Sequence, residues 1–159
     1  MGGEGECRVA GGNGEGTLGG GGGEDSMEGG PGQDSRRAAS GNDSVHGGAG
    51  DDQIHGGSGA DFLYGNFGSD VLYAGMDVER AYGGVGDDRI VGGYGWDSLY
   101  GGVGSDTLDG GRGADVLTGG AGADIFVFHA GESTARAPDH VMDYHRGQQD
   151  QMLFDGAQS

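Results

Sequence analysis

Residues 47–64 read Gly-Gly-Ala-Gly-Asp-Asp-Gln-Ile-His followed by Gly-Gly-Ser-Gly-Ala-Asp-Phe-Leu-Tyr, two units of nine residues built to one plan. Glycine fills the first, second and fourth positions of each unit, aspartate fills the sixth and an aliphatic residue fills the eighth. A frame of nine that starts at Gly2 runs without insertion to Val127, which makes 14 units. A repeat of fixed period indicates a solenoid in which each unit stacks on its neighbours.

The pattern is regular along most of this frame. The fourth position is Gly in 13 of the 14 units, and the sixth is Asp in 11 units and Glu79 in one more. The eighth position is apolar in 13 units, the exception being Arg36. Unit 74–82 keeps its length but loses much of the pattern, and we expect the coil to continue through it with weaker ion sites on either side.

The composition by itself is typical of a disordered chain. Of the 159 residues 43 are Gly, and the formal net charge is −18. Few large apolar side chains are present to offset the entropy of ordering. The strict phase over residues 38–127 argues against a disordered linker there. In residues 1–37 the repeats are eroded, with Cys7 and Gly16 at the sixth position, and we expect this arm to be poorly ordered.

Charge and motifs argue against several classes of function. An acidic surface repels nucleic acid and anionic membranes, and no apolar run approaches the roughly 20 residues that cross a bilayer. The chain has no Lys for a phosphate-binding P-loop, and its single cysteine, Cys7, permits no intrachain disulfide. Neither a zinc-protease motif, H-E-x-x-H, nor a serine-hydrolase motif, G-x-S-x-G, occurs. We therefore predict that the chain is not an enzyme, and we expect no transmembrane segment and no cleavable N-terminal signal.

Each unit predicts one short strand and one glycine-rich turn. Positions seven to nine should form a strand of about three residues with position eight facing inward. The other six residues should make the turn, because Gly adopts positive φ at little cost. Two strands and two turns then close a coil every 18 residues, with the eighth-position side chains stacked between two parallel sheets. One aliphatic side chain per unit contributes about 2 kcal/mol, which does not offset about 1 kcal/mol of backbone ordering per residue.

The sixth-position acids indicate what supplies the missing stability. Coiling brings acids two units apart into register along both edges, where uncompensated carboxylates repel one another. A hard cation such as Ca²⁺ accepts six to eight oxygen ligands from carboxylates and backbone carbonyls, and glycine turns leave their carbonyls unshielded. Units three to fourteen contain about ten such pairs of acids.

In these residues the chain resembles the RTX (haemolysin-type) calcium-binding nonapeptide repeat family, strongly over 38–127 and weakly over 2–37. The resemblance implies an all-β fold, a right-handed parallel β-roll (a β-solenoid) in which several Ca²⁺ ions are each held by loop carbonyls and the sixth-position Asp of two turns. Carried over, the carboxylate ligands are Asp43, Asp52, Asp61, Asp70, Asp88, Asp97, Asp106, Asp115 and Asp124. The glycines of the ligating turns are Gly48, Gly50, Gly57, Gly59, Gly68, Gly84, Gly86, Gly93, Gly95, Gly102, Gly104, Gly111, Gly113, Gly120 and Gly122.

The period stops after Val127, and residues 128–159 resemble the C-terminal cap of serralysin-type RTX exoproteins. The matching positions are Phe126, Phe128, Ser133, Asp139, Val141, Asp143, Tyr144, Gly147, Asp150 and Met152. This chain has Leu153 where the family usually has an acid. The resemblance implies a β cap over the open end of the solenoid and a candidate partial secretion signal.

The sequence therefore predicts a calcium-binding module of a secreted, extracellular protein. It should be disordered at cytosolic Ca²⁺ and fold at extracellular Ca²⁺ of about 10⁻⁴–10⁻³ M. The resemblance implies export by a type I secretion apparatus.

Two alternatives stay open. One is a polysaccharide- or surface-binding accessory module, suggested by Tyr64, Tyr82 and Tyr100 at 18-residue spacing on one outer face, although cross-strand stacking explains them more simply. The other is a C-terminal fragment of a secreted protease or lipase.

Overall fold

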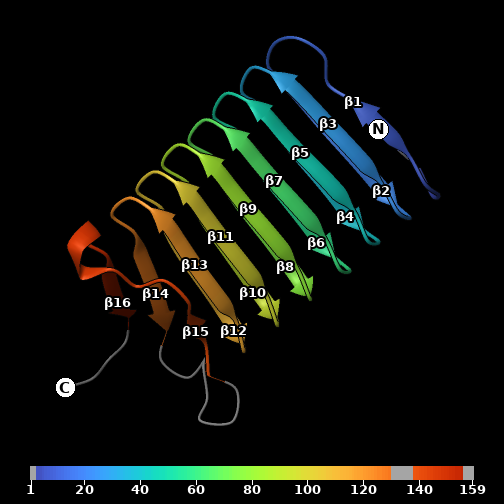
Figure 1. Cartoon of the computed structure of the whole chain (residues 1–159). Helices are drawn as coiled ribbons and strands as arrows, with labels where there is room; N and C mark the ends of the chain where they lie inside the picture. The colour runs from blue at the N-terminus through green and yellow to red at the C-terminus, as the bar shows by residue number, and fades with distance from the viewer. Residues whose placement is uncertain (1–2, 130–137, 156–159) are drawn as a thin grey trace.

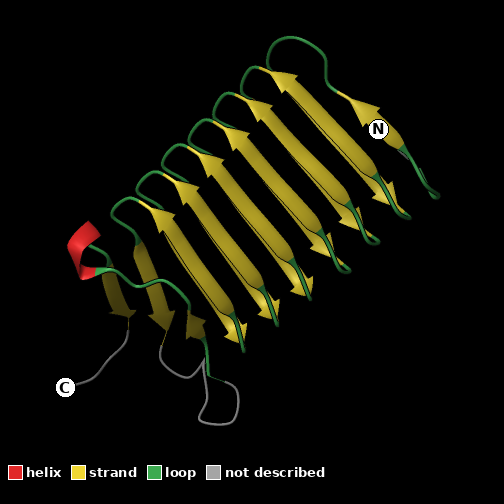
Figure 2. Ribbon diagram, viewed as in Figure 1, coloured by secondary structure: helices red, strands yellow, loops and turns green. Residues whose placement is uncertain are grey.

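The computed structural model describes residues 3–129 and 138–155, which wind into a coil of two parallel sheets (Figures 1 and 2). One sheet contains β1 (Arg8–Ala10), β3 (Ser26–Pro31), β5 (Ser44–Ala49), β7 (Phe62–Phe67), β9 (Arg80–Val85), β11 (Ser98–Val103), β13 (Val116–Ala121) and β15 (His140–Val141). The other contains β2 (Gly16–Gly22), β4 (Asp34–Ser40), β6 (Gln53–Ser58), β8 (Val71–Asp77), β10 (Arg89–Gly95), β12 (Thr107–Gly113), β14 (Ile125–His129) and β16 (Gln151–Asp155). Successive strands alternate between the sheets, which confirms the predicted all-β parallel β-roll.

Neighbouring strands of a sheet are offset by one coil of 18 residues. Leu72, for example, lies opposite Ile54 on one side and Ile90 on the other. The degenerate unit 74–82 keeps this register, because Ala81 pairs with Leu63 and with Leu99. The coil therefore continues through that unit, as the sequence predicts.

The strands are about twice as long as expected. β5 has six residues, and only its first three belong to positions seven to nine of a unit. A ladder of backbone hydrogen bonds needs no side chains, so the first residues of the following unit pair as well. The turn then shrinks to about three residues at positions four to six. At Gly50 this turn has φ +118°, and a Cβ there would lie 2.5 Å from the carbonyl oxygen of Gly32 in the preceding coil. The fourth-position glycine is thus required by both conformation and stacking.

The apolar interior is one column of eighth-position side chains, as predicted. Its fully buried members from the eighth position are Met27, Val45, Ile54, Leu63, Leu72, Ala81, Ile90, Leu99, Leu108, Leu117 and Phe126. Ala38 and Ala74, which replace the first-position glycine of their units, are buried beside them. Each coil therefore adds about two aliphatic side chains to the core.

The N-terminal residues continue the same coil through β1 to β4. Met27 lies opposite Val9 and Val45, in the register of the later repeats. Arg36 takes the column position opposite Ile54 and is fully buried. The poor order predicted for residues 1–37 stays a prediction about the chain in solution.

The C-terminal segment extends both sheets by one strand. β15 pairs with β13 and β16 pairs with β14, and a 3₁₀ turn, Arg146–Gln148, lies between them (Figure 1). Residue Ser133 of the predicted cap lies outside the described residues. Across the described ranges, no helix has the length and apolarity needed to cross a membrane.

Candidate metal centre

The sixth-position acids form two rows, one along each edge of the coil, with their side chains turned into the interior. The first acidic row consists of Asp25, Asp43, Asp61, Glu79, Asp97 and Asp115, and the second of Asp34, Asp52, Asp70, Asp88, Asp106 and Asp124. None of these twelve residues is more than 3% exposed. The sequence predicted the register of these acids at the edges, but it gave no sign of their complete burial.

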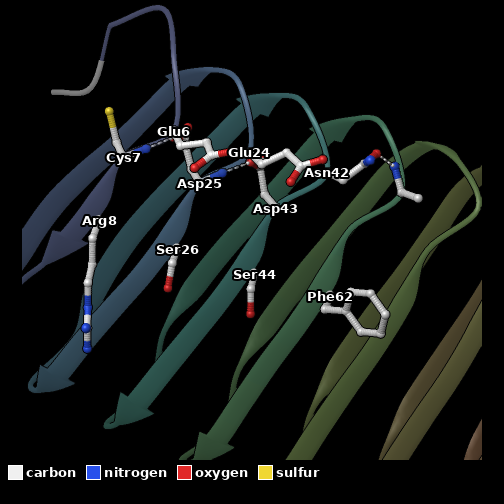
Figure 3. A pocket seen from close by; sticks show the side chains of 11 residues that line it. Glu6, Cys7, Arg8, Glu24, Asp25, Ser26, Asn42, Asp43, Ser44 and Phe62 are labelled. Atoms are coloured by element: carbon white, nitrogen blue, oxygen red, sulfur yellow. Dashed lines mark hydrogen bonds between the residues drawn. The ribbon is translucent and has the colours of Figure 1, made fainter.

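Within each row a carboxylate oxygen accepts the backbone N–H of the acid one coil earlier. The N–H of Asp52 donates to Oδ1 of Asp70 at 2.8 Å, and the N–H of Asp70 donates to Oδ1 of Asp88 at 2.8 Å. Figure 3 shows the start of the first row, where Cys7 donates to Asp25 and Asp25 donates to Asp43. These bonds fasten each turn to the next one along the solenoid.

The C-terminal segment ends both rows. The N–H of Asp115 donates to Oδ1 of Asp139 at 3.1 Å, and the N–H of Asp124 donates to Oδ1 of Asp150 at 3.2 Å. Asp143 accepts the backbone N–H groups of Gly119 and Gly120 near the end of β13. Three of the positions selected by resemblance to a cap therefore hold the segment against the final repeats.

The second oxygen of nearly every carboxylate is buried without a hydrogen-bond partner among the described residues. These oxygens are the Oδ2 atoms of Asp25, Asp43, Asp52, Asp61, Asp70, Asp88, Asp97, Asp106, Asp115 and Asp124. A buried oxygen without a partner carries a desolvation penalty that grows when it is charged. Two rows of such oxygens fit a hard cation, because Ca²⁺ binds carboxylates and carbonyls in preference to other ligands.

The first-position glycine makes room for the carboxylate. A Cβ at Gly56 would lie 2.5 Å from Oδ2 of Asp61 and 2.5 Å from the carbonyl oxygen of Ala74. By sequence alone this glycine belongs only to the turn. Its position five residues before the aspartate was the available signal that the two share one space.

All fifteen glycines predicted to ligate have positive φ, between +86° and +152°. Their carbonyls stack directly on one another from coil to coil, so that a Cβ at Gly102 in β11 would collide with the carbonyl oxygen of Gly84 in β9. Among the described residues no three His, Cys, Asp or Glu side chains converge on one point. Beyond the carboxylates of two turns, further protein ligands would have to be backbone carbonyls of this kind.

At Asp61 and Asp88 burial raises the pKa of the carboxyl, the accepted N–H bond opposes the rise, and neighbouring carboxylates add to it. The pKa rises from 3.8 to about 6 for Asp61, Asp70 and Asp106. It rises to about 7 for Asp88 and Asp115. Without a cation, Asp88 and Asp115 are therefore partly protonated at neutral pH, whereas the carboxyls with a pKa of about 6 gain protons mainly below it.

Glu79 interrupts the first row. In the described part of the chain its carboxylate receives no backbone N–H, although its own N–H donates to Oδ1 of Asp97 at 3.0 Å. Burial, followed by the adjacent Asp97 carboxyl, raises the pKa of Glu79 to about 9. The pKa of Asp97 is raised as well, mainly by burial. At neutral pH this pair keeps a proton, and the weaker ion sites around unit 74–82 stay a prediction.

Four aromatic rings stack on the outer face of one sheet. His46, Tyr64, Tyr82 and Tyr100 lie opposite one another on β5, β7, β9 and β11, with centroid distances of 4.5, 5.0 and 4.8 Å and interplanar angles of 5° to 6°. The tyrosine stack is the one predicted. Both faces of Tyr82 contact a neighbouring ring, so the stack resembles cross-strand stabilisation and not an open platform.

Two further histidines have specific partners. His46, His55, His129, His140 and His145 are scattered along the sequence, and side chains spaced in this way are expected to be solvated or capping. His55 stacks on Tyr73 at 4.8 Å, and Nε2 of His129 lies 2.9 Å from Oδ2 of Asp109. The 18-residue spacing of His55 and Tyr73 was the signal that could have paired them.

Comparison with known families supports the same assignment. The model of the RTX calcium-binding nonapeptide repeat (4 copies) matches three segments, residues 37–72, 73–108 and 100–135. Together these segments span more than half of the chain. A search of curated proteins found no match to the chain.

Proposed function

Because the chain belongs to the RTX calcium-binding nonapeptide repeat family, we propose that it is a module of a secreted protein that folds when it binds Ca²⁺. The observation that carries this proposal is the pair of rows of buried Oδ2 atoms without partners. Folding brings together carboxylate charges that the protein itself leaves uncompensated. Ca²⁺, the ion that this family binds, is a hard cation that suits carboxylate oxygens.

The proposed ligands are the row aspartates from Asp43 to Asp124 named above, with carbonyls of the second- and fourth-position glycines. Two carboxylates from successive turns of one row face each ion. Ca²⁺ supplies the positive charge that these oxygens need in a buried site. The residues themselves set the spacing, because each Oδ1 accepts the N–H of the preceding turn.

The same rows make folding dependent on the ion. Without metal and above neutral pH, deprotonated carboxylates in one row repel at a spacing of one strand. The apolar column of each coil is too thin to offset that repulsion together with the ordering entropy. The binding free energy of Ca²⁺ then becomes folding free energy, so the chain is disordered in the cytosol and ordered outside the cell. Catalysis is not part of this role.

Repeats of this family typify secreted proteins, and we propose an extracellular location after export of the unfolded chain by a type I secretion apparatus. The absence of a disulfide framework is consistent with stabilisation by metal, since the described part of the chain has one free cysteine, Cys7. A protease or lipase activity of a longer parent protein stays a proposal without support among the described residues.

A titration with Ca²⁺ followed by far-ultraviolet circular dichroism tests the proposal, with Mg²⁺ as the control ion. We expect a cooperative transition from coil to β structure that is specific to Ca²⁺ near about 10⁻⁴–10⁻³ M. A metal-free chain that already has its full β signal at pH 8 would contradict the proposal. So would a chain that gains no β signal at about 10 mM Ca²⁺. The polysaccharide alternative predicts that Tyr82→Ala lowers glycan retention without lowering the affinity for Ca²⁺, whereas we expect glycan retention to stay unchanged because both faces of Tyr82 are already stacked.

A further inference from the structure

One buried cation already lies in the second acidic row. Arg36 occupies the eighth position of unit 29–37, where the other units place an apolar side chain, and it is fully buried. Its Nη2 lies 2.7 Å from Oδ2 of Asp34, and its Nη1 lies 3.5 Å from Oδ2 of Asp52. These two aspartates are successive members of the row, since the N–H of Asp34 donates to Oδ1 of Asp52 at 2.8 Å.

This contact distinguishes Asp34 from the other repeat aspartates of both rows. Each of the others has a buried Oδ2 without a hydrogen-bond partner among the described residues, whereas Oδ2 of Asp34 accepts a hydrogen bond from Arg36 and its Oδ1 is the oxygen left without one. The guanidinium also fills the space beside the first-position glycine, since a Cβ at Gly29 would overlap it. In other units, as at Gly56, that space faces the carboxylate oxygen of Asp61 and a backbone carbonyl, with no cationic side chain beside them.

A guanidinium and a Ca²⁺ ion cannot share these oxygens. Two cations within a few ångströms in a buried site repel strongly, and Arg remains charged at any pH at which the protein folds. Moving Arg36 out of the column would leave a cavity opposite Ile54 and expose the apolar column to the turn. The guanidinium is therefore a permanent part of this pair.

We propose that Arg36 takes the place of one Ca²⁺ ion, so that the Asp34–Asp52 pair closes without metal while the other pairs of the rows bind it. The inference rests on the proposed function, because it concerns which pairs bind the ion. Asp34 is the informative residue. The unit one coil before it has Gly16 at the sixth position, so Asp34 belongs to this pair alone, whereas Asp52 also faces Asp70.

The test counts Ca²⁺ ions per chain by equilibrium dialysis and elemental analysis at saturating Ca²⁺. Arg36→Leu restores an aliphatic residue in the column and should bind one ion more than the wild type. Asp34→Asn in the wild-type chain should leave the count unchanged, whereas Asp34→Asn added to Arg36→Leu should remove the extra ion. Arg37→Leu is the matched control, because Arg37 is the exposed neighbour and its removal changes the net charge equally.

Two results would overturn the inference while leaving the proposed function intact: an unchanged count in Arg36→Leu, or the loss of one ion in the single variant Asp34→Asn. A wild-type chain that binds no Ca²⁺ would instead overturn the proposed function, and the inference with it. If Arg36→Leu fails to fold, Arg36→Met replaces it, and the Asp34→Asn arm in the wild-type chain decides the question without either variant. An unchanged count there supports metal-free closure of the pair.

Discussion

Lowering the pH should fold the chain in the absence of metal. The pKa values of the buried carboxyls lie above their ordinary value of 3.8, at about 6 for Asp70 and about 7 for Asp88. A folded-state pKa above the unfolded one means that protonation favours the folded coil. The stabilisation is complete below about pH 4 and is lost as the pH rises through about 6 to 7.

The stabilisation gained by protonating these carboxyls is large enough to decide whether the coil folds without metal. Shifts from 3.8 to about 6 or 7 correspond to about 3–4 kcal/mol per group at about 1.4 kcal/mol per pKa unit. Water near the turns screens part of this, and we halve it for that reason. Five such groups still contribute on the order of 10 kcal/mol, which equals the whole stability of a typical domain. Without metal, we therefore expect a folded chain near pH 5 and an unfolded chain at pH 8.

Far-ultraviolet circular dichroism in chelator across this pH range measures the transition, and sedimentation checks that the chain stays monomeric. The double variant Asp88→Asn/Asp106→Asn keeps both side-chain acceptors but removes two buried charges, so its midpoint should shift to higher pH. The control, Glu6→Gln/Glu15→Gln, changes the net charge equally at exposed positions far from these carboxyls in the sequence. Equal midpoints in the two double variants would refute the reasoning, as would a metal-free chain without β structure at pH 5.

Further substitutions test the packing of the Ca²⁺-loaded coil by thermal unfolding. Gly56→Ala places a methyl group 2.5 Å from a buried carboxylate oxygen and should cost about 1–3 kcal/mol, whereas Gly147→Ala has open space and should be neutral; equal melting temperatures would contradict the shared space. Leu99→Ala removes a fully buried column side chain and should cost about 2–5 kcal/mol, against less than about 0.5 kcal/mol for Val103→Ala on the exposed surface. Tyr82→Ala breaks two ring contacts and should cost about 1–3 kcal/mol, and an unchanged melting temperature would show that the stack contributes nothing.

The period of nine was enough to predict the fold. Because side chains alternate along a strand and each unit supplies one strand, the repeat determined the two sheets, the 18-residue register and the column from Val45 to Phe126. It also predicted that Tyr64, Tyr82 and Tyr100 would meet. The predicted strand length was wrong. Glycine has a low intrinsic preference for strands, but its backbone pairs well once the neighbouring coil offers hydrogen-bond partners.

The candidate site was less accessible to sequence reasoning. The row aspartates were identified by position, but whether their side chains face solvent or the interior depends on the first-position glycine, which reads as another turn residue. Arg36 was identified as the exception at the eighth position, where a buried charge is costly without a partner. The carboxylates that pair with it, Asp34 and Asp52, lie two residues before it and sixteen after it, and only the closed coil brings both to one point. Whether each predicted ligand binds Ca²⁺ stays a prediction.

Because successive units alternate between the two sheets, it matters whether an odd or an even number of units is inserted or deleted. An insertion or deletion of one coil returns every later residue to its own sheet and row, whereas a change of nine residues exchanges the sheets for everything downstream. Loss of the unit 74–82, for example, would move Tyr100 away from the face that carries Tyr64. The later acids of the first acidic row would then follow the earlier acids of the second row, and the reverse. The sequence repeats every nine residues, but only changes of two units at a time can lengthen or shorten this molecule without exchanging its sheets.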